Sequence, residues 1–215
     1  MTTGAKGVDQ VRERVLEAAC ELFTRRGINS TGVDLVSEVA GVSKRSLYQR
    51  FPSKDHLIAA YLPRATDRFL EAVLPSEGDT TPPAGRLVAV FDTARRASAD
   101  PDFRGCPVLN AAAELLDPEH PVRGVALGYK QRMEAYFTEL AAAAGAVDAA
   151  LLAEQLVVVF DGAMAYAAVR RTAFPESVCR TVRTLLATQG LEPVAGTTEE
   201  PAKPHRPEEV AAVSA

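Results

Sequence analysis

TGVDLVSEVAGVSKRSLYQRF, residues 31–51, is the stretch that decides the fold of the N-terminal part of the chain. Its small apolar residues recur at three- and four-residue steps, which gives one helix an inward face: Val33, Val36, Val39 and Ala40. Gly41 follows where the chain must turn sharply, a backbone position that favours a residue without a Cβ. Ser37, four residues earlier, is small enough to let two helices approach closely. The stretch predicts two short helices, over 33–40 and 44–50, joined by a tight turn.

The second of these helices has a distinctive outward face. Ser43 is a good N-cap for it, and Val42 and Leu47 are expected to anchor it to the bundle. The residues left on its outer face are polar or basic: Lys44, Arg45, Ser46, Tyr48, Gln49 and Arg50. Cations suit phosphates, and polar side chains can reach base edges. The face predicts DNA contact; the alternative is a bundle whose surface Lys and Arg are only solvated.

Charge is divided unevenly along the chain. The net charge is −4, but residues 1–55 hold nine Lys and Arg against seven Asp and Glu, a net +2, and the rest carries −6. A local basic patch matters more to a polyanion than the total charge does. The 47% hydrophobic and 24% charged residues are ordinary for a folded protein.

The sequence gives no sign of an enzyme, a metal site or a cofactor. Cys20, Cys106 and Cys179 are far apart and lack metal-ligand spacing, which fits a reducing cytoplasm. There is no phosphate-binding glycine loop or nucleophile motif. Glu114 and Asp161 could in principle form a carboxylate pair, but nothing in the sequence fixes the distance between them. The N-terminus lacks a secretory pattern, and the apolar run 156–169 is interrupted and too short for a bilayer. We therefore expect a bacterial cytoplasmic protein with no membrane partner.

The remaining pattern is helical throughout. A stripe on one face predicts a first helix that ends at Gly27: Val8, Val11, Val15, Ala19, Leu22 and Phe23. Ser53 can cap a fourth helix that starts at Lys54 and runs to about Val73, and the Pro- and Gly-rich segment 74–85 marks the change of domain. Further helices are expected over 86–99, 106–116, 121–144, 149–172 and 176–188. The fold class is all-α, with about nine helices and a tail, 190–215, expected to be disordered.

From about Val8 to Phe69 the sequence resembles the N-terminal domain of the tetracycline-repressor (TetR/AcrR) family. The matching residues are Ala19, Leu22, Phe23, Gly27, Val33, Asp34, Ala40-Gly41-Val42-Ser43, Leu47, Tyr48 and Phe51-Pro52-Ser53-Lys54. The resemblance implies a three-helix helix-turn-helix DNA-binding domain over 8–68, with its motif at 31–50. It also implies a larger helical ligand-binding and dimerisation domain over 69–189.

Carried over by position, the resemblance assigns DNA contacts. Tyr48 and Lys54 match residues that meet phosphates, Lys54 with help from a helix dipole, and Thr31 would offer its hydroxyl to another phosphate. Lys44, Arg45 and Gln49 take groove-facing positions. The family often has Gly where this chain has Arg45, which could bond either a guanine or a phosphate.

A second subunit is expected to cover the apolar helix over 149–172. This helix is apolar nearly all round, so it must be covered on both sides. By resemblance, it and the last helix pair with their symmetry mates through Leu152, Leu156, Val159, Gly162, Ala163, Val178, Val182 and Leu185. The alternative is that the helix is simply the centre of a monomer's core.

A small-molecule effector is implied by the resemblance but not identified by it. Candidate pocket residues are Phe91, Phe103, Asn110, Glu114, Tyr129, Met133, Tyr136, Phe160 and Met164, although such residues at helical spacing are more often core. Asp161, a carboxylate in an apolar helix, needs a local partner, solvent or a ligand. Cys106 lacks the basic neighbours of a redox sensor, and His120 is expected to be structural or exposed.

These observations predict a DNA-binding transcriptional regulator. The expected mechanism is a homodimeric repressor that a small-molecule effector releases from a palindromic operator. The alternatives are an activator of the same family, or a helical protein-interaction adaptor without DNA affinity.

Overall fold

The computed structural model describes residues 3–76 and 78–192, with side chains from Gln10 onward. Over these residues it has nine helices and no strand. The expected disordered tail lies, from residue 193 on, outside the described residues. The helices are α1 (Thr3–Arg26), α2 (Val33–Val39), α3 (Lys44–Tyr48), α4 (Lys54–Val73), α5 (Pro83–Ala97), α6 (Pro107–Glu114), α7 (Val122–Ala144), α8 (Ala149–Arg170) and α9 (Glu176–Thr188). The prediction of an all-helical chain is therefore confirmed.

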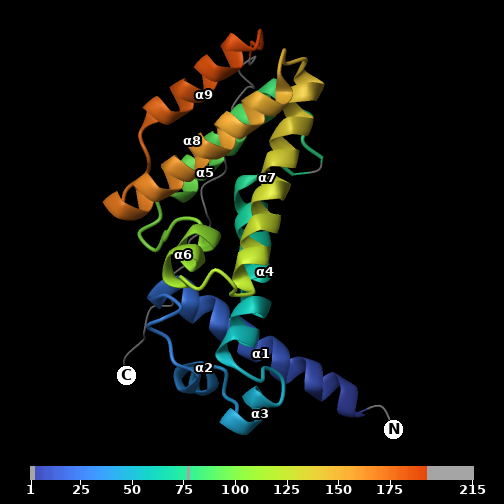
Figure 1. The fold of residues 1–215 in the computed structure, drawn as a ribbon, viewed down its shortest axis with the longest axis vertical. Coiled ribbons are helices and arrows are strands. Elements are labelled where there is room, and N and C mark those ends of the chain that lie inside the picture. The colour runs from blue at the N-terminus through green and yellow to red at the C-terminus, as the bar shows by residue number, and fades with distance from the viewer. Residues whose placement is uncertain (1–2, 77, 193–215) are drawn as a thin grey trace, which may run out of the picture.

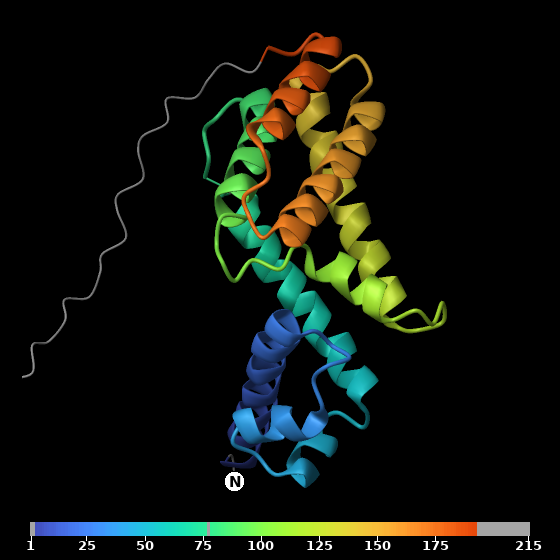
Figure 2. The same ribbon diagram turned by 90° about the vertical axis from the view of Figure 1, so that its left-hand side faces the viewer.

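The helices form two bundles, one small and one larger, that share the long helix α4 (Figures 1 and 2). We call the small bundle, made of α1, α2, α3 and the first half of α4, the head. Helices α5 to α9 form the larger bundle at the other end of the molecule. The predicted domain boundary at 68/69 falls inside α4, which contacts α1 in the head and α5, α6 and α7 beyond it.

Glycine and proline mark helix ends and starts at or near the residues that the sequence predicts. Gly27 ends α1 with φ +87°, a left-handed conformation that glycine adopts without a steric cost. A Cβ at Gly27 would also lie 3.1 Å from a carboxylate oxygen of Glu114. Helix α5 begins at Pro83, three residues before its predicted start, because proline suits the first turn of a helix.

The head has its own core, to which every helix contributes. The buried residues are Val15, Leu16, Ala19, Leu22, Phe23, Val36, Leu47, Phe51, Leu57 and Ile58. Leu47 is the buried residue of α3 and is 0% exposed. The short helix α3 is therefore attached to the head largely through one side chain.

The core of the larger bundle is aromatic. Phe91 of α5 stacks on Phe137 of α7 at 6.0 Å between ring centroids, and meets Phe160 of α8 edge-on at 5.7 Å. Met133 and Met164 are also buried there. These residues, together with the buried Tyr129 and the half-buried Tyr136, pack inside the bundle.

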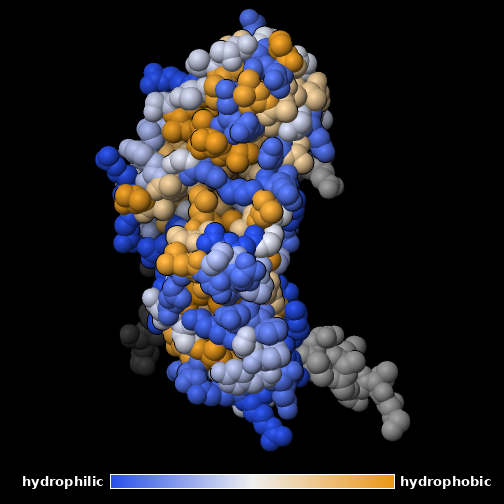
Figure 3. Space-filling model, in the orientation of Figure 1, coloured by the Kyte–Doolittle hydropathy of each residue, from blue (hydrophilic) through white to orange (hydrophobic). Residues whose placement is uncertain are grey.

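Helix α8 has two apolar faces with different surroundings. One face packs inward, chiefly against α7, and holds Leu152, Ala153, Leu156, Phe160, Ala163, Met164 and Ala167. The other is exposed and carries Leu151, Val158, Gly162, Tyr166 and Val169. In Figure 3 hydrophobic residues gather on the upper part of the surface, where Figure 1 places α8 and α9. By length and composition alone, α8 is apolar enough to cross a membrane, and 39% of its apolar window is buried inside the protein.

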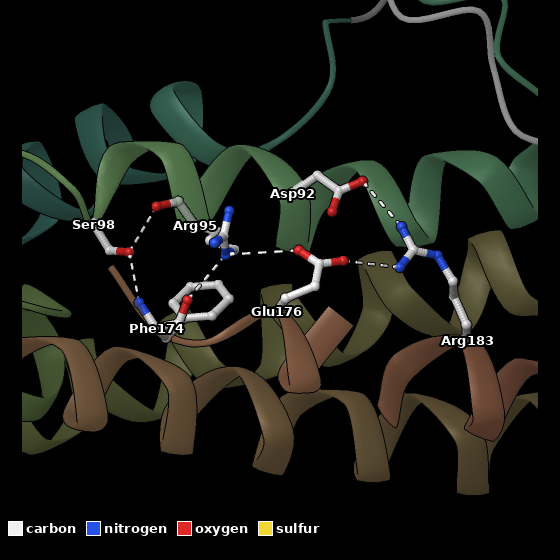
Figure 4. Close-up of polar contacts among 6 residues, drawn as sticks. All are labelled: Asp92, Arg95, Ser98, Phe174, Glu176 and Arg183. Carbon is white, nitrogen blue, oxygen red and sulfur yellow. Dashed lines mark hydrogen bonds and ion pairs between the residues drawn. The ribbon is translucent and has the colours of Figure 1, made fainter. Parts of the chain in front are cut away.

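Helix α9 is held against α5 by a chain of polar contacts (Figure 4). Arg183 pairs with Asp92 at 3.6 Å and with Glu176 at 3.4 Å. Arg95 Nε donates to the carbonyl of Phe174 at 3.0 Å, just before α9 begins. Phe174 itself is 0% exposed. These contacts within one chain therefore hold α9 in place against α5.

Replacing Leu47 by Ala is predicted to destabilise the head. The substitution leaves a cavity under α3, and a buried Leu→Ala change costs about 2–5 kcal/mol. Denaturant unfolding followed by circular dichroism measures the loss in free energy of unfolding. Gln49→Ala, an exposed change at the C-cap of the same helix, is the control and should stay within about 0.5 kcal/mol. Equal stabilities of the two variants would show that Leu47 does not anchor α3.

Candidate nucleic-acid interface

The turn between α2 and α3 has the geometry that its sequence predicts. Gly41 has φ +62°, and its N–H donates to the Glu38 carbonyl at 3.0 Å. Val42 N–H donates to the Ser37 carbonyl at 3.0 Å. Ser37 is buried, and its hydroxyl donates to the Val33 carbonyl at 3.0 Å. The small side chain of Ser37 therefore fits, buried, beside the turn between the two helices.

Ser43 caps α3 as expected. Its hydroxyl oxygen accepts the N–H of Ser46 at 3.1 Å and lies 2.9 Å from the Ser46 hydroxyl. This cap satisfies one of the free N–H groups at the helix start. With Leu47 pointing inward, the opposite side of α3 is left uncovered by the residues that the structure describes.

The uncovered side presents the predicted DNA-contacting side chains. Arg45, Tyr48 and Gln49 are exposed, Tyr48 to 46%. Within the part of the chain that the structure describes, the side chains of Arg45, Tyr48 and Gln49 make no hydrogen bond or ion pair. Arg50 is half-buried, and its guanidinium donates to the Ser46 carbonyl at 3.0 Å. A guanidinium, a phenol and an amide therefore project together from one short helix.

Lys44 has a partner that the sequence interpretation missed. Its ammonium lies 2.5 Å from a carboxylate oxygen of Asp34, in the first turn of α2, and both side chains are more than half exposed. The hydrogen bond to Asp34 raises the pKa of Lys44. Exposed ion pairs are weak, so a phosphate can compete for Lys44. The sequence feature that could have indicated this ion pair is the acidic Asp34 at the start of α2.

The prediction that Thr31 offers its hydroxyl to a phosphate is wrong in this structure. Thr31 is 0% exposed, and its hydroxyl donates to the Gly27 carbonyl at 2.8 Å. The hydrogen bond lies within the linker between α1 and α2, and the Thr31 side chain points into the protein. Its role is structural.

Lys54 lies at the start of α4, as predicted, but it also bonds within the head. Its ammonium donates to the Ile28 carbonyl at 2.6 Å, and Ser53 caps the helix by accepting the His56 N–H at 3.3 Å. An ammonium has three N–H donors. Lys54 can therefore hold the α1–α2 linker and still meet an anion.

The predicted pocket residues divide into two groups. Phe103, Asn110 and Glu114 line a cleft of about 760 Å³ between the head and α6. The other six do not line it, because they pack inside the larger bundle: Phe91, Tyr129, Met133, Tyr136, Phe160 and Met164. Sequence reasoning missed the part of this cleft that α1 and α4 form, which includes Phe23, Tyr61 and Arg68.

Four of the predicted dimer residues are taken up by the chain's own core. Leu152, Leu156, Ala163 and Val182 are at most 2% exposed, so they present no surface to a second subunit. Val159, Val178 and Leu185 are half-buried, and Gly162 is exposed. The sequence showed an apolar helix but not which of its faces the chain covers.

Three further residues have clear surroundings. Asp161 forms an ion pair with Lys130 of α7, one of the local partners that the sequence left open. Burial raises the pKa of the Cys106 thiol, which opposes a reactive thiolate. His120 is nearly buried and lies 3.5 Å from Asp55, which fits its structural interpretation.

Comparison with protein families gives two matches along the chain. Residues 15–61 match the model of bacterial regulatory proteins of the tetR family. Residues 83–184 match the model of the tetracyclin repressor-like C-terminal domain. The first range includes α2, α3 and the turn between them, and the second covers most of the larger bundle.

Solved structures of similar proteins share the whole fold. A putative TetR transcriptional regulator from Streptomyces avermitilis is 40% identical, with a TM-score of 0.78 over 85% of this chain and 99% of that one. A TetR-family transcriptional regulator from Streptomyces coelicolor is 33% identical, with a TM-score of 0.75 over 84% and 96% of the two chains.

Curated relatives match over shorter stretches. An uncharacterized HTH-type transcriptional regulator from Mycobacterium tuberculosis is 33% identical over 96 residues, 45% of this chain and 48% of that protein. The HTH-type transcriptional activator FasR from Mycolicibacterium smegmatis is 39% identical over 84 residues, 39% and 38% of the two chains. The matches thus span about half or less of these curated relatives. With the family models and the solved structures, they show that this chain belongs to the TetR family of DNA-binding transcriptional regulators.

Proposed function

We propose that the protein is a homodimeric repressor, acting in the bacterial cytoplasm, that a small-molecule effector releases from a palindromic operator. In this proposal residues 8–68 bind DNA and residues 69–189 bind the effector and the second subunit. The observation that carries the proposal is the outward face of α3, where Arg45, Tyr48 and Gln49 project without partners among the described residues. Side chains that make no internal hydrogen bond have none to break when they bind DNA.

Each exposed group on α3 has a suitable counterpart on a duplex. Tyr48 and Lys44 are suited to phosphates, which fix the position of the head but read no sequence. Arg45 and Gln49 reach outward from the same helix and are suited to base edges. If Arg45 makes a bidentate contact with guanine, it contributes about 1–3 kcal/mol of discrimination against the wrong base.

The exposed apolar face of α8 supports a second copy of the chain as the partner. Val158 is 67% exposed, Val169 83% and Leu151 44%, on the face opposite the core. Gly162 lies among them with open space at its Cβ position, so another backbone could approach closely. A two-fold contact here would set the heads about one DNA turn apart, roughly 34–36 Å.

The effector would act through its different affinity for two spacings of the heads. A ligand that binds both spacings equally shifts nothing, and about 5.5 kcal/mol of difference moves a population from 1:99 to 99:1. Activation is the second candidate, because the relative FasR is named as an activator. Transcription of a reporter gene behind the bound operator, measured with and without the protein, distinguishes repression from activation.

Replacing both Lys44 and Tyr48 by Ala is predicted to abolish most operator binding. Operator fragments are first selected from a random DNA pool, and affinities are then measured across salt concentrations. Each lost phosphate contact should lower the slope of log K against log salt by about 0.9. Thr31→Val is the matched control: its hydroxyl faces Gly27, so the slope should not change. Wild-type binding by the double variant would refute this interface, and salt-independent binding would favour the adaptor alternative.

Val158→Asp is predicted to dissociate the dimer. A charge placed in an apolar contact must be desolvated without a partner, which is strongly unfavourable. Sedimentation velocity should show dimer for the wild type and monomer for the variant. Leu127→Asp on α7, where Leu127 is 60% exposed, is the control and should remain dimeric. A dimeric Val158→Asp variant would place the subunit contact elsewhere.

A further inference from the structure

The cleft between the head and the larger bundle has the size of a ligand site. Its volume of about 760 Å³ lies within the usual range for small molecules, about 300–1,000 Å³. The end of α1, the middle of α4, the segment 97–107 and α6 form its walls. Both bundles therefore contact whatever fills it. Figure 3 shows hydrophobic and hydrophilic residues side by side at this height of the molecule.

Aromatic side chains make up much of the apolar lining. Phe23 and Tyr61 pack edge-to-face in the head, with ring centroids 5.1 Å apart. Phe69 and Phe103 are only half-buried, so part of each ring is free to contact a ligand. Phe69 is held in place by Phe160 behind it, at 6.2 Å. A flat, apolar ligand would find preformed aromatic contacts here.

The polar lining of the cleft contains five carboxylates and three guanidinium groups. Each carboxylate already has a donor. Glu17 meets Arg68 at 2.7 Å, Glu21 and Asp102 meet Arg25 at 3.7 and 3.4 Å, Asp100 accepts the Asp102 N–H at 2.7 Å, and Glu114 accepts the Asn29 N–H at 2.7 Å. The side chains of Glu17, Glu21 and Asp102 are 63%, 58% and 67% exposed. Three of the five carboxylates therefore have arginine partners and are mostly exposed to water, whereas Asp100 and Glu114 accept neutral backbone N–H groups.

Arg104 differs from the other two arginines of the cleft. Arg25 and Arg68 have carboxylate partners, whereas the buried Nε of Arg104 has no hydrogen-bond partner among the residues that the structure describes. A buried donor without an acceptor is costly, and an anion would remove that cost. Arg104 also lies just before α6, whose positive dipole end favours negative charge.

The segment that carries Arg104 is held firmly in place. Asn110 donates its side-chain amide to the Arg104 carbonyl at 2.8 Å. Gly105 has φ +84°, and a Cβ there would lie 3.1 Å from Ala168 on α8. Only glycine fits this close approach without strain. The guanidinium is therefore presented from a fixed backbone that rests on α8.

We propose that this cleft binds a small aromatic carboxylate. Arg104 takes the carboxylate, and the apolar body lies against Phe69 and Phe103. Binding at this cleft does not require DNA. The regulatory consequence rests on the proposed function: Glu114, at the end of α6, holds Asn29 of the head through two hydrogen bonds of 2.7 and 2.9 Å. A ligand in the cleft therefore bears directly on the orientation of the head.

Calorimetry on the full chain without DNA tests the site, with 2-naphthoate as the probe. We expect saturable binding of one naphthoate per chain, and binding about tenfold or more weaker for the neutral 2-naphthamide. Arg104→Gln should weaken naphthoate binding by about 10- to 100-fold, since a hydrogen bond to a charged group is lost. Arg104→Lys should restore part of the affinity. Arg96→Gln, which changes an exposed arginine of α5, is the control and should bind as the wild type does.

Several results would overturn the proposal. They are no naphthoate binding at millimolar concentration, equal binding of the amide, a preference for naphthylmethylamine, or unchanged binding by a folded Arg104→Gln variant. Operator affinity with saturating naphthoate is measured separately, and a change of about fivefold or more is expected. If naphthoate binds but no DNA does, the proposed function fails and the ligand site stands. If DNA binds but naphthoate does not, the ligand site fails and the proposed function stands.

Discussion

The burial of Leu47 is the contact on which the proposed DNA-binding surface depends. Helix α3 is only five residues long, and a helix that short is not stable alone in water. Its position comes from the Ser43 cap, the turn at Gly41 and the insertion of Leu47 into the head core. Once Leu47 points inward, the helical repeat directs Arg45, Tyr48 and Gln49 outward. The same side chain thus supplies stability and orients the surface.

The larger bundle offers two surfaces that bear on how the heads are used. In the proposed dimer the exposed face of α8 would set the distance between two heads, and a ligand in the proposed site beside α6 would set the tilt of one head on its bundle. Gly105 joins these features, because it lets the segment before α6 rest on α8. The effector site, the subunit contact and the DNA-binding head would then be coupled through helices that touch one another.

Local chemistry explains what the sequence could predict. Caps, glycine turns and helical spacing act within a few residues, so the helices and the outward face of α3 were predictable. Thr31 was misassigned because its direction depends on the carbonyl of Gly27, which only the folded linker places beside it. Leu152 and Val182 were misassigned because an all-apolar helix does not show which face its own chain covers. The cleft joins segments from α1 to α6, a juxtaposition that no local pattern encodes.

The central claim is that the outward face of α3 meets DNA, and a cysteine probe tests it directly. Cys20, Cys106 and Cys179 are buried, so a Gln49→Cys variant carries one accessible thiol among the described residues. Its alkylation rate is measured with and without saturating operator, and Glu119→Cys, far along the chain at an exposed position, serves as the reference. The account predicts strong protection of the thiol introduced at position 49 and none of the thiol at position 119. Equal alkylation of the Gln49→Cys variant in its free and DNA-bound forms would contradict it.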